Sequence, residues 1–93
     1  MVGSYLTEGL RSLERQYAEL LGNVRGRGLM CAFDGVSVTA RDRIVTELYR
    51  LGVIVLRCGE KSVRFRPSLT FTRAEADELL ARVADALKRV ASL

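Results

Sequence analysis

Two arginines at alternate positions are the residues in this sequence best suited to hold an anion. Arg64 and Arg66 alternate with Val63 and Phe65 in the segment Ser62–Leu69, which reads SVRFRPSL. Because successive side chains of an extended strand point to opposite faces, both guanidinium groups would lie on one face and both apolar side chains on the other. The pattern predicts either a carboxylate-binding arginine or cations that are simply solvated on an exposed sheet face.

Other chemistry has little support in the residues. The sequence has no histidine, and its two cysteines, Cys31 and Cys58, are not in a C-x-x-C pair, so no metal site is expected. Both cysteines lie in or beside apolar segments and should be buried, reduced thiols. The only lysines are Lys61, in a short turn beside Glu60, and Lys88, on the polar face of a helix. Neither has the apolar setting that imine chemistry requires, so no catalytic residue is assigned.

Composition indicates one small domain. The chain has 93 residues and is 48% hydrophobic. Its net charge is +4, and its basic residues are scattered along the sequence and mixed with eleven acidic residues. Disorder is not expected, because only 28% of the residues are charged and there is one proline. We see neither a signal peptide nor a membrane span, and reduced thiols lead us to expect a cytoplasmic protein.

Apolar residues recur at helical spacing in three stretches. We expect a first helix from a Ser4 cap to a stop at Gly22, a second from a cap within Thr39–Asp42 to Gly52, and a third from the capping box Thr72–Glu75. The three apolar stripes comprise Leu6, Leu10, Leu13, Tyr17 and Leu20; Ile44, Leu48 and Leu51; and Ala76, Leu79, Leu80, Val83, Leu87 and Val90.

Three segments have the composition of strands: Leu29–Phe33, Val53–Leu56 and Ser62–Arg66. A turn at Asp34-Gly35 should follow the first strand, and a hairpin loop at Arg57–Lys61 should join the other two. The order is helix, strand, helix, strand, strand, helix. It predicts an α+β domain with a short, mainly antiparallel three-stranded sheet and helices packed on one face. The other face would then be left for something else to cover.

The segment before the first predicted strand is rich in glycine. Asn23–Gly28 reads NVRGRG, and two glycines two positions apart indicate a bulge or the close approach of another segment. A phosphate-binding loop is excluded, because no Gly-Lys-Ser/Thr follows and a strand, not a helix, comes next.

Several of these segments together carry a resemblance to a known family. They are Asn23–Asp34 (NVRGRGLMCAFD), Gly52–Leu56 (GVIVL), Cys58-Gly59, Ser62–Pro67 (SVRFRP) and Leu69-Thr70. Over Ser4 to Val90 the chain resembles the C-terminal small domain of class III (omega) pyridoxal-phosphate aminotransferases. Its pattern is most similar to the L-lysine 6-aminotransferases, and next to the 4-aminobutyrate aminotransferases. It departs from the family pattern at Ser68, where many relatives have a second proline, and in the connector Asp34–Thr39.

The resemblance implies a fold-type-I aminotransferase that works as a homodimer, with residues 1–93 as its single small domain. In the family, pyridoxal 5'-phosphate is held through a lysine of an upstream large domain that this sequence does not contain. The arginine that matches Arg64 grips the carboxylate of 2-oxoglutarate or glutamate. The amine donor would be L-lysine or a related ω-amino acid. Arg66 matches the motif but is assigned no contact, and the chain alone should neither bind the cofactor nor transaminate.

Two alternatives stay open. Arg25, Arg27, Arg64 and Arg66 could make a stand-alone module that binds an anionic ligand or nucleic acid, although the chain lacks the aromatic pair and the GxxG loop of common RNA-binding folds. The isolated domain could instead self-associate through its uncovered sheet face.

Overall fold

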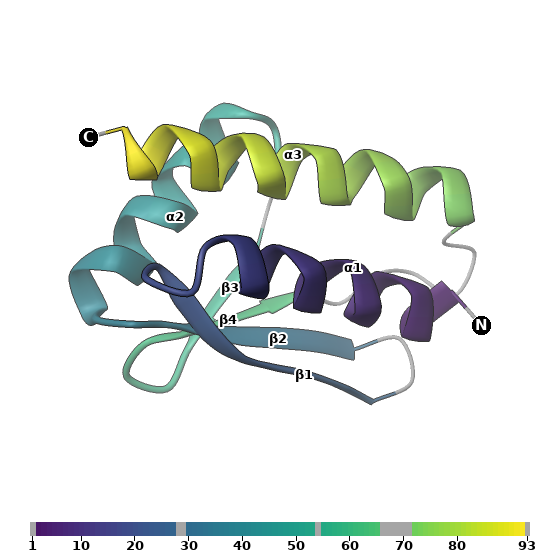
Figure 1. The fold of residues 1–93 in the computed structure, drawn as a ribbon, viewed down its shortest axis with the longest axis horizontal. Helices are drawn as coiled ribbons and strands as arrows, with labels where there is room; N and C mark the ends of the chain where they lie inside the picture. The colour runs from purple at the N-terminus through teal and green to yellow at the C-terminus, as the bar shows by residue number, and fades with distance from the viewer. Residues whose placement is uncertain (1, 28–29, 54, 66–71, 93) are drawn as a thin grey trace.

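The structure, a computed structural model, describes residues 2–27, 30–53, 55–65 and 72–92. Over these residues the chain forms three helices and four strands (Figure 1). The helices are α1 (Val2–Gln16), α2 (Val38–Arg50) and α3 (Arg73–Ala91). The strands are β1 (Leu21–Arg27), β2 (Met30–Gly35), β3 (Leu56–Cys58) and β4 (Ser62–Phe65). The α+β class is therefore confirmed, with one strand more than predicted.

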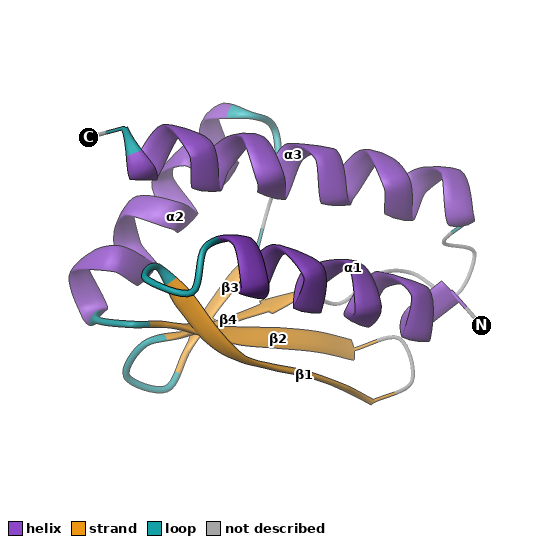
Figure 2. Cartoon of the chain, in the orientation of Figure 1, coloured by secondary structure: helices purple, strands orange, loops and turns teal. Residues whose placement is uncertain are grey.

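The four strands form one antiparallel sheet in the order β1-β2-β4-β3. The three described helices lie on the same side of this sheet, as predicted (Figure 2). We call the opposite side the open face. A single helical layer covers only one side of a sheet, so no described element of this chain packs against the open face.

The core lies between the sheet and the helices. Alternate residues of β2 and β4 point into it, and the rings of Phe33 and Phe65 meet there with centroids 5.8 Å apart. The helical stripes supply the other half of the core, largely as predicted. Its fully buried members from the helices include Leu6, Leu10, Ile44, Leu48, Val83 and Leu87.

The strand that sequence patterns did not predict is β1. It pairs with β2 from Leu21 to Arg27, and the pairing register shifts between Gly22 and Arg25. Asn23 has a φ of 54°, in the left-handed region, so the glycine-rich segment does contain the predicted bulge. A Cβ on Gly26 would lie 2.2 Å from the Thr7 Oγ1 atom of α1, which confirms that another segment approaches closely here.

Two strand boundaries were predicted wrongly. Asp34 and Gly35 do not form a turn but extend β2, where they pair with β1. Of the described residues in the segment Val53–Leu56, only Leu56 belongs to a strand, whereas Val53 and Val55 are buried outside the sheet ladder. The apolar character of Val53 and Val55 therefore reflects burial rather than strand pairing.

The ends of α1 were also predicted wrongly, and so was the start of α2. Helix α1 begins at Val2 rather than at Ser4, and it ends at Gln16 because the chain turns well before Gly22. The N-cap of α2 is Ser37, two residues before Thr39, because the Ser37 side chain accepts a hydrogen bond from the Ala40 N–H.

Two other helix ends match the sequence prediction. Gly52 has a φ of 82° and follows the last turn of α2, where a residue with a Cβ would be strained. The capping box at the start of α3 is formed in both directions between Thr72 and Glu75.

Candidate functional site

Arg64 lies in the middle of β4, with its side chain on the open face. Its strand neighbours Val63 and Phe65 are buried against the helices, as the alternation predicted. Its backbone partners are Ala32 on β2 and Leu56 on β3. The side chain is half-buried and makes no hydrogen bond or ion pair with any residue that the structure describes. Arg66 lies outside the described residues, as do Pro67 to Thr70.

A shallow depression of about 290 Å³ surrounds this side chain. Its lining comes from β1, β2, β3 and β4 and comprises Arg25, Gly26, Met30, Ala32, Cys58 and Arg64. The two guanidinium groups bring positive charge to it, and Met30 and Ala32 add apolar surface. A site of this kind, with few polar groups on an apolar wall, suits a small anion that also has a carbon chain.

The guanidinium group of Arg25 is already paired with the carboxylate of Asp34. The Asp34 carboxylate accepts hydrogen bonds from Asn23 at 3.0 Å, from the Ser62 hydroxyl at 2.5 Å and from Arg25 at 3.1 Å. The amide of Asn23 and the hydroxyl of Ser62, with the guanidinium of Arg25 beside them, hold the pKa of the Asp34 carboxyl below its usual value. Of the described residues that line the depression, Arg64 is thus the cation left to receive a ligand.

The open face also exposes apolar side chains. Met30 is 39% exposed and lines the depression with Arg64, and Leu56 is 54% exposed and is the β3 partner of Arg64. The prediction that this chain would leave one sheet face uncovered is therefore confirmed for the elements described.

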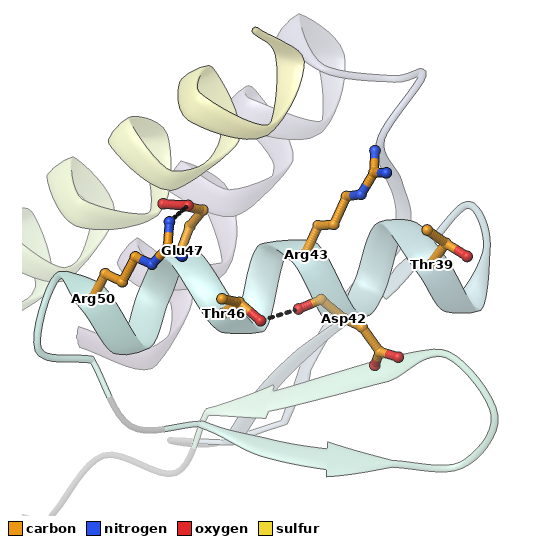
Figure 3. Close-up of a pocket in the computed structure, with 6 residues that line it drawn as sticks. All are labelled: Thr39, Asp42, Arg43, Thr46, Glu47 and Arg50. Carbon is orange, nitrogen blue, oxygen red and sulfur yellow. Dashed lines mark hydrogen bonds and ion pairs between the residues drawn. The ribbon is translucent and has the colours of Figure 1, made fainter. Parts of the chain in front are cut away.

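A second hollow, of about 360 Å³, lies on the outer surface of α2 (Figure 3). It is the larger of the two, yet its lining comes from α2 alone, and the side chains do not converge on one point. Glu47 already pairs with Arg50 at 2.8 Å, and Thr46 donates to the Asp42 carbonyl. Both acidic groups of the lining are already paired, Glu47 with Arg50 and Asp42 with Arg41, so we do not regard this hollow as a ligand site.

The cysteines do not form a reactive pair. Both are free thiols, but only Cys31 is buried as predicted, whereas Cys58 is half-buried at the edge of the depression. Burial raises the pKa of the Cys31 thiol, and its hydrogen bond with Thr7 lowers it by less. Cys31 is therefore a core residue rather than a nucleophile.

The lysines and the metal-ligating residue types are the groups that could hold a cofactor or a metal. Lys61 and Lys88, the only lysines of the sequence, are both exposed, so neither has the apolar setting of an imine-forming lysine. No cluster of three or more His, Cys, Asp or Glu side chains occurs in the described ranges. A search of the same ranges finds no helix that is long and apolar enough to span a membrane.

Comparison with known proteins identifies the family. Residues 1–87 match the model of the family described as aminotransferase class-III, and the chain belongs to this family. The L-lysine-epsilon aminotransferase of Amycolatopsis lactamdurans is 42% identical over 86 residues, which are 91% of this chain and 19% of that protein. The mitochondrial 4-aminobutyrate aminotransferase of Mus musculus is 41% identical over 70 residues, 75% of this chain and 14% of that protein.

Solved structures agree with this assignment. The lysine aminotransferase from M. tuberculosis, in its internal aldimine form, superposes with a TM-score of 0.90 at 42% identity. The match covers 95% of this chain and 20% of that one. The chain therefore spans about a fifth of the length of the relatives it matches. These matches confirm the predicted resemblance to class III aminotransferases. The family depends on pyridoxal phosphate.

Sequence patterns missed the hydrogen-bonded group around Asp34 on the open face. Alternation placed Ser62 on the same face as Arg64, but nothing in the sequence indicated that Asp34 lies opposite Ser62. The prediction of a turn at Asp34 removed it from the sheet. A strand extended by two residues would have put its carboxylate on the open face, beside the arginines.

Proposed function

We propose that this chain is the C-terminal small domain of a class III aminotransferase that moves the terminal amino group of L-lysine, or of a related ω-amino acid, to 2-oxoglutarate. Arg64 contributes the guanidinium that binds the substrate carboxylate. The observation that carries this proposal is the position of Arg64, half-buried in a depression of the open face with its charge unmatched by any described side chain.

A guanidinium in this position suits the reaction. It can bind a carboxylate through two parallel hydrogen bonds, which fixes the direction of the carbon chain as well as its position. Orientation of this kind supplies a large part of the rate in reactions that need a defined geometry. The strand backbone on both sides of Arg64 is paired, so its Cα is held by β2 and β3.

The rest of the active site would come from other polypeptide. Because neither Lys61 nor Lys88 fits an imine-forming role, a large domain would hold pyridoxal phosphate. We infer that the open face docks against the large domain, that a second subunit completes a homodimer, and that the enzyme is cytoplasmic. Free thiols at Cys31 and Cys58 suit a reducing compartment.

Reconstitution tests the proposal. The chain is mixed with a separately produced large domain of a lysine aminotransferase, and pyridoxal absorbance and glutamate formation are followed. We expect activity only in the mixture, and Arg64→Ala should lower kcat/KM for 2-oxoglutarate by about 100-fold, because a desolvated charge pair is lost.

The matched control is Arg43→Ala, which removes an exposed arginine of α2 that lies away from the depression. Its kcat/KM should equal that of the unmodified chain. Full activity of Arg64→Ala in the reconstituted enzyme would show that the carboxylate role is wrong.

The two alternative functions have distinct readouts. A nucleic-acid module requires affinity that falls steeply with salt, and the pairing of Arg25 with Asp34 leaves it less free charge than the sequence indicated. Self-association through Met30 and Leu56 requires a mass that rises with concentration. A monomer that binds no nucleic acid but docks on the large domain supports the aminotransferase proposal.

A further inference from the structure

We propose that Arg41 is a positioning residue, which anchors the turn between β3 and β4 and thereby sets where Arg64 presents its guanidinium. This inference rests on the carboxylate-binding role proposed for Arg64. Arg41 itself belongs to α2 and does not line the depression. It would act on the substrate only through the backbone of the hairpin.

Arg41 is a buried arginine whose donors are directed at backbone. Only 7% of the residue is exposed. Its Nη1 donates to the Ser62 carbonyl at 3.0 Å and its Nη2 donates to the Glu60 carbonyl at 3.0 Å. These two acceptors lie on either side of Lys61 in the turn that leads into β4. The planar fork of a guanidinium can hold two such carbonyls at a fixed spacing, which an ammonium group cannot.

The carbonyl between them is held as well. The Lys61 oxygen accepts a hydrogen bond from the Gly35 N–H at 2.8 Å, at the end of β2. Three consecutive carbonyls of the turn are therefore bound, two by a side chain of α2 and one by the neighbouring strand. A Cβ on Gly35 would lie 2.8 Å from the Arg41 backbone N, so the strand end and the helix start are in close contact here.

Ser62 links this anchor to the open face. Its carbonyl is held by Arg41, while its hydroxyl donates to Asp34 at 2.5 Å on the opposite side of the sheet. Arg64 follows two residues later on the same face, about 6.8 Å along the strand. A shift of the turn that moved Ser62 would therefore move the guanidinium of Arg64 relative to the depression.

Charge explains why an arginine is tolerated at this buried position. The Arg41 Nε donates to the Asp42 carboxylate at 2.8 Å, so the cation is paired. The Asp42 carboxylate points from α2 toward the hairpin (Figure 3). It also lies 3.7 Å from the Nε atom of Arg57 on β3. Helix α2 thus holds the turn through Arg41 and also reaches β3 through Asp42.

The test uses the reconstituted enzyme and measures the two half-reactions separately. One uses an amine donor without a carboxylate, and the other uses 2-oxoglutarate. Arg41→Met keeps the length of the side chain and removes its donors. We expect the KM for 2-oxoglutarate to rise about tenfold, because small displacements of a binding group cost one to two orders of magnitude. The KM for the carboxylate-free amine should stay unchanged.

Two further variants complete the set. Arg41→Lys keeps the charge and can reach only part of the turn, so its KM for 2-oxoglutarate should lie between those of the unmodified chain and Arg41→Met. Arg43→Met removes an exposed arginine two residues further along α2, and should leave both KM values unchanged. A purely structural role of Arg41 would lower the amount of active enzyme without separating the two substrates.

Hydrogen exchange of the chain gives a readout independent of activity. In Arg41→Met we expect the amides of residues 60–65 to exchange about tenfold faster, with those of α3 unchanged. Arg64→Ala should leave this exchange pattern as it is. If Arg41→Met does not fold, Arg41→Lys carries the same test of the KM split.

The outcomes separate the two proposals. If Arg64→Ala leaves the 2-oxoglutarate half-reaction intact, the proposed function fails. If Arg64→Ala impairs that half-reaction but folded Arg41 variants do not, or if they impair both half-reactions equally, the positioning role alone is overturned.

Discussion

The two faces of the sheet are built from the same strands but differ in how far their side chains are buried. In β2 and β4 the residues that point toward the helices, such as Phe33 and Val63, are completely buried. On the open face, Met30 beside the buried Cys31 and Arg64 beside the buried Val63 keep part of their surface accessible. The helix-covered side of these strands therefore forms the core, whereas ligand binding is proposed for the open face. Mutational effects should alternate along the strands in the same way.

The largest effect should follow from a truncation on the helix-covered face. Phe33→Ala removes a fully buried ring that packs on Phe65, and we expect the free energy of unfolding to fall by about 3–5 kcal/mol. Urea unfolding followed by circular dichroism measures the change. Met30→Ala in the same strand is the control for the open face, and a loss as large as that of Phe33→Ala would refute the division between the faces.

A smaller effect should come from Asp34, a charged group near the end of β2 that is hydrogen-bonded to Ser62 and Arg25. Because hydrogen bonds lower its pKa in the folded state, it adds stability at pH values above the unfolded pKa of about 3.9, and this stability is lost as the pH falls through the folded pKa. Asp34→Asn should cost about 1–2 kcal/mol at pH 7. It should also flatten the dependence of unfolding free energy on pH below about 4.

Measurements of unfolding free energy from pH 7 down to 3, on the unmodified chain and on Asp34→Asn, check this. An equal pH dependence of the two proteins would show that the carboxylate does not contribute as described.

The smallest effect on stability is expected at Leu56. It is 54% exposed on the open face, so Leu56→Ala should change the free energy of unfolding by less than about 0.5 kcal/mol. If the open face docks on the large domain as proposed, the same variant should need a higher concentration of that domain for half-maximal activity, because it removes apolar surface. Unchanged reconstitution would indicate that docking does not use this part of the face.

Much of this arrangement could be predicted from the sequence. The stripe of α3 and the capping box at Thr72 follow from local spacing, and the alternation around Arg64 placed its side chain on the face opposite the core. These features depend on neighbours within a few residues, which is why a single sequence shows them. The resemblance to class III aminotransferases extended the prediction to the role of Arg64, which reconstitution has still to test.

Features that depend on distant partners could not be predicted. Strand β1 has no apolar alternation, because a bulge and two glycines interrupt it, and only its pairing with β2 defines it. The sequence pattern placed Arg41 within a helix cap, whereas its hydrogen-bond acceptors are carbonyls 19 and 21 residues away. Backbone acceptors exist at every residue, so the sequence holds no mark of which ones a buried arginine will bind.

The bulge in β1 has a consequence for how copies of this domain meet. β1 is an outer strand of the sheet, and an uninterrupted outer strand offers free backbone groups on which another molecule can add a strand. Two residues of β1, Asn23 and Val24, stand opposite a single residue of β2, and Asn23 turns left-handed there. Because this bulge breaks the regular row of backbone donors and acceptors, another copy of the chain should pair poorly with β1. We therefore expect the bulge to hinder fibre formation at this edge when the chain is concentrated.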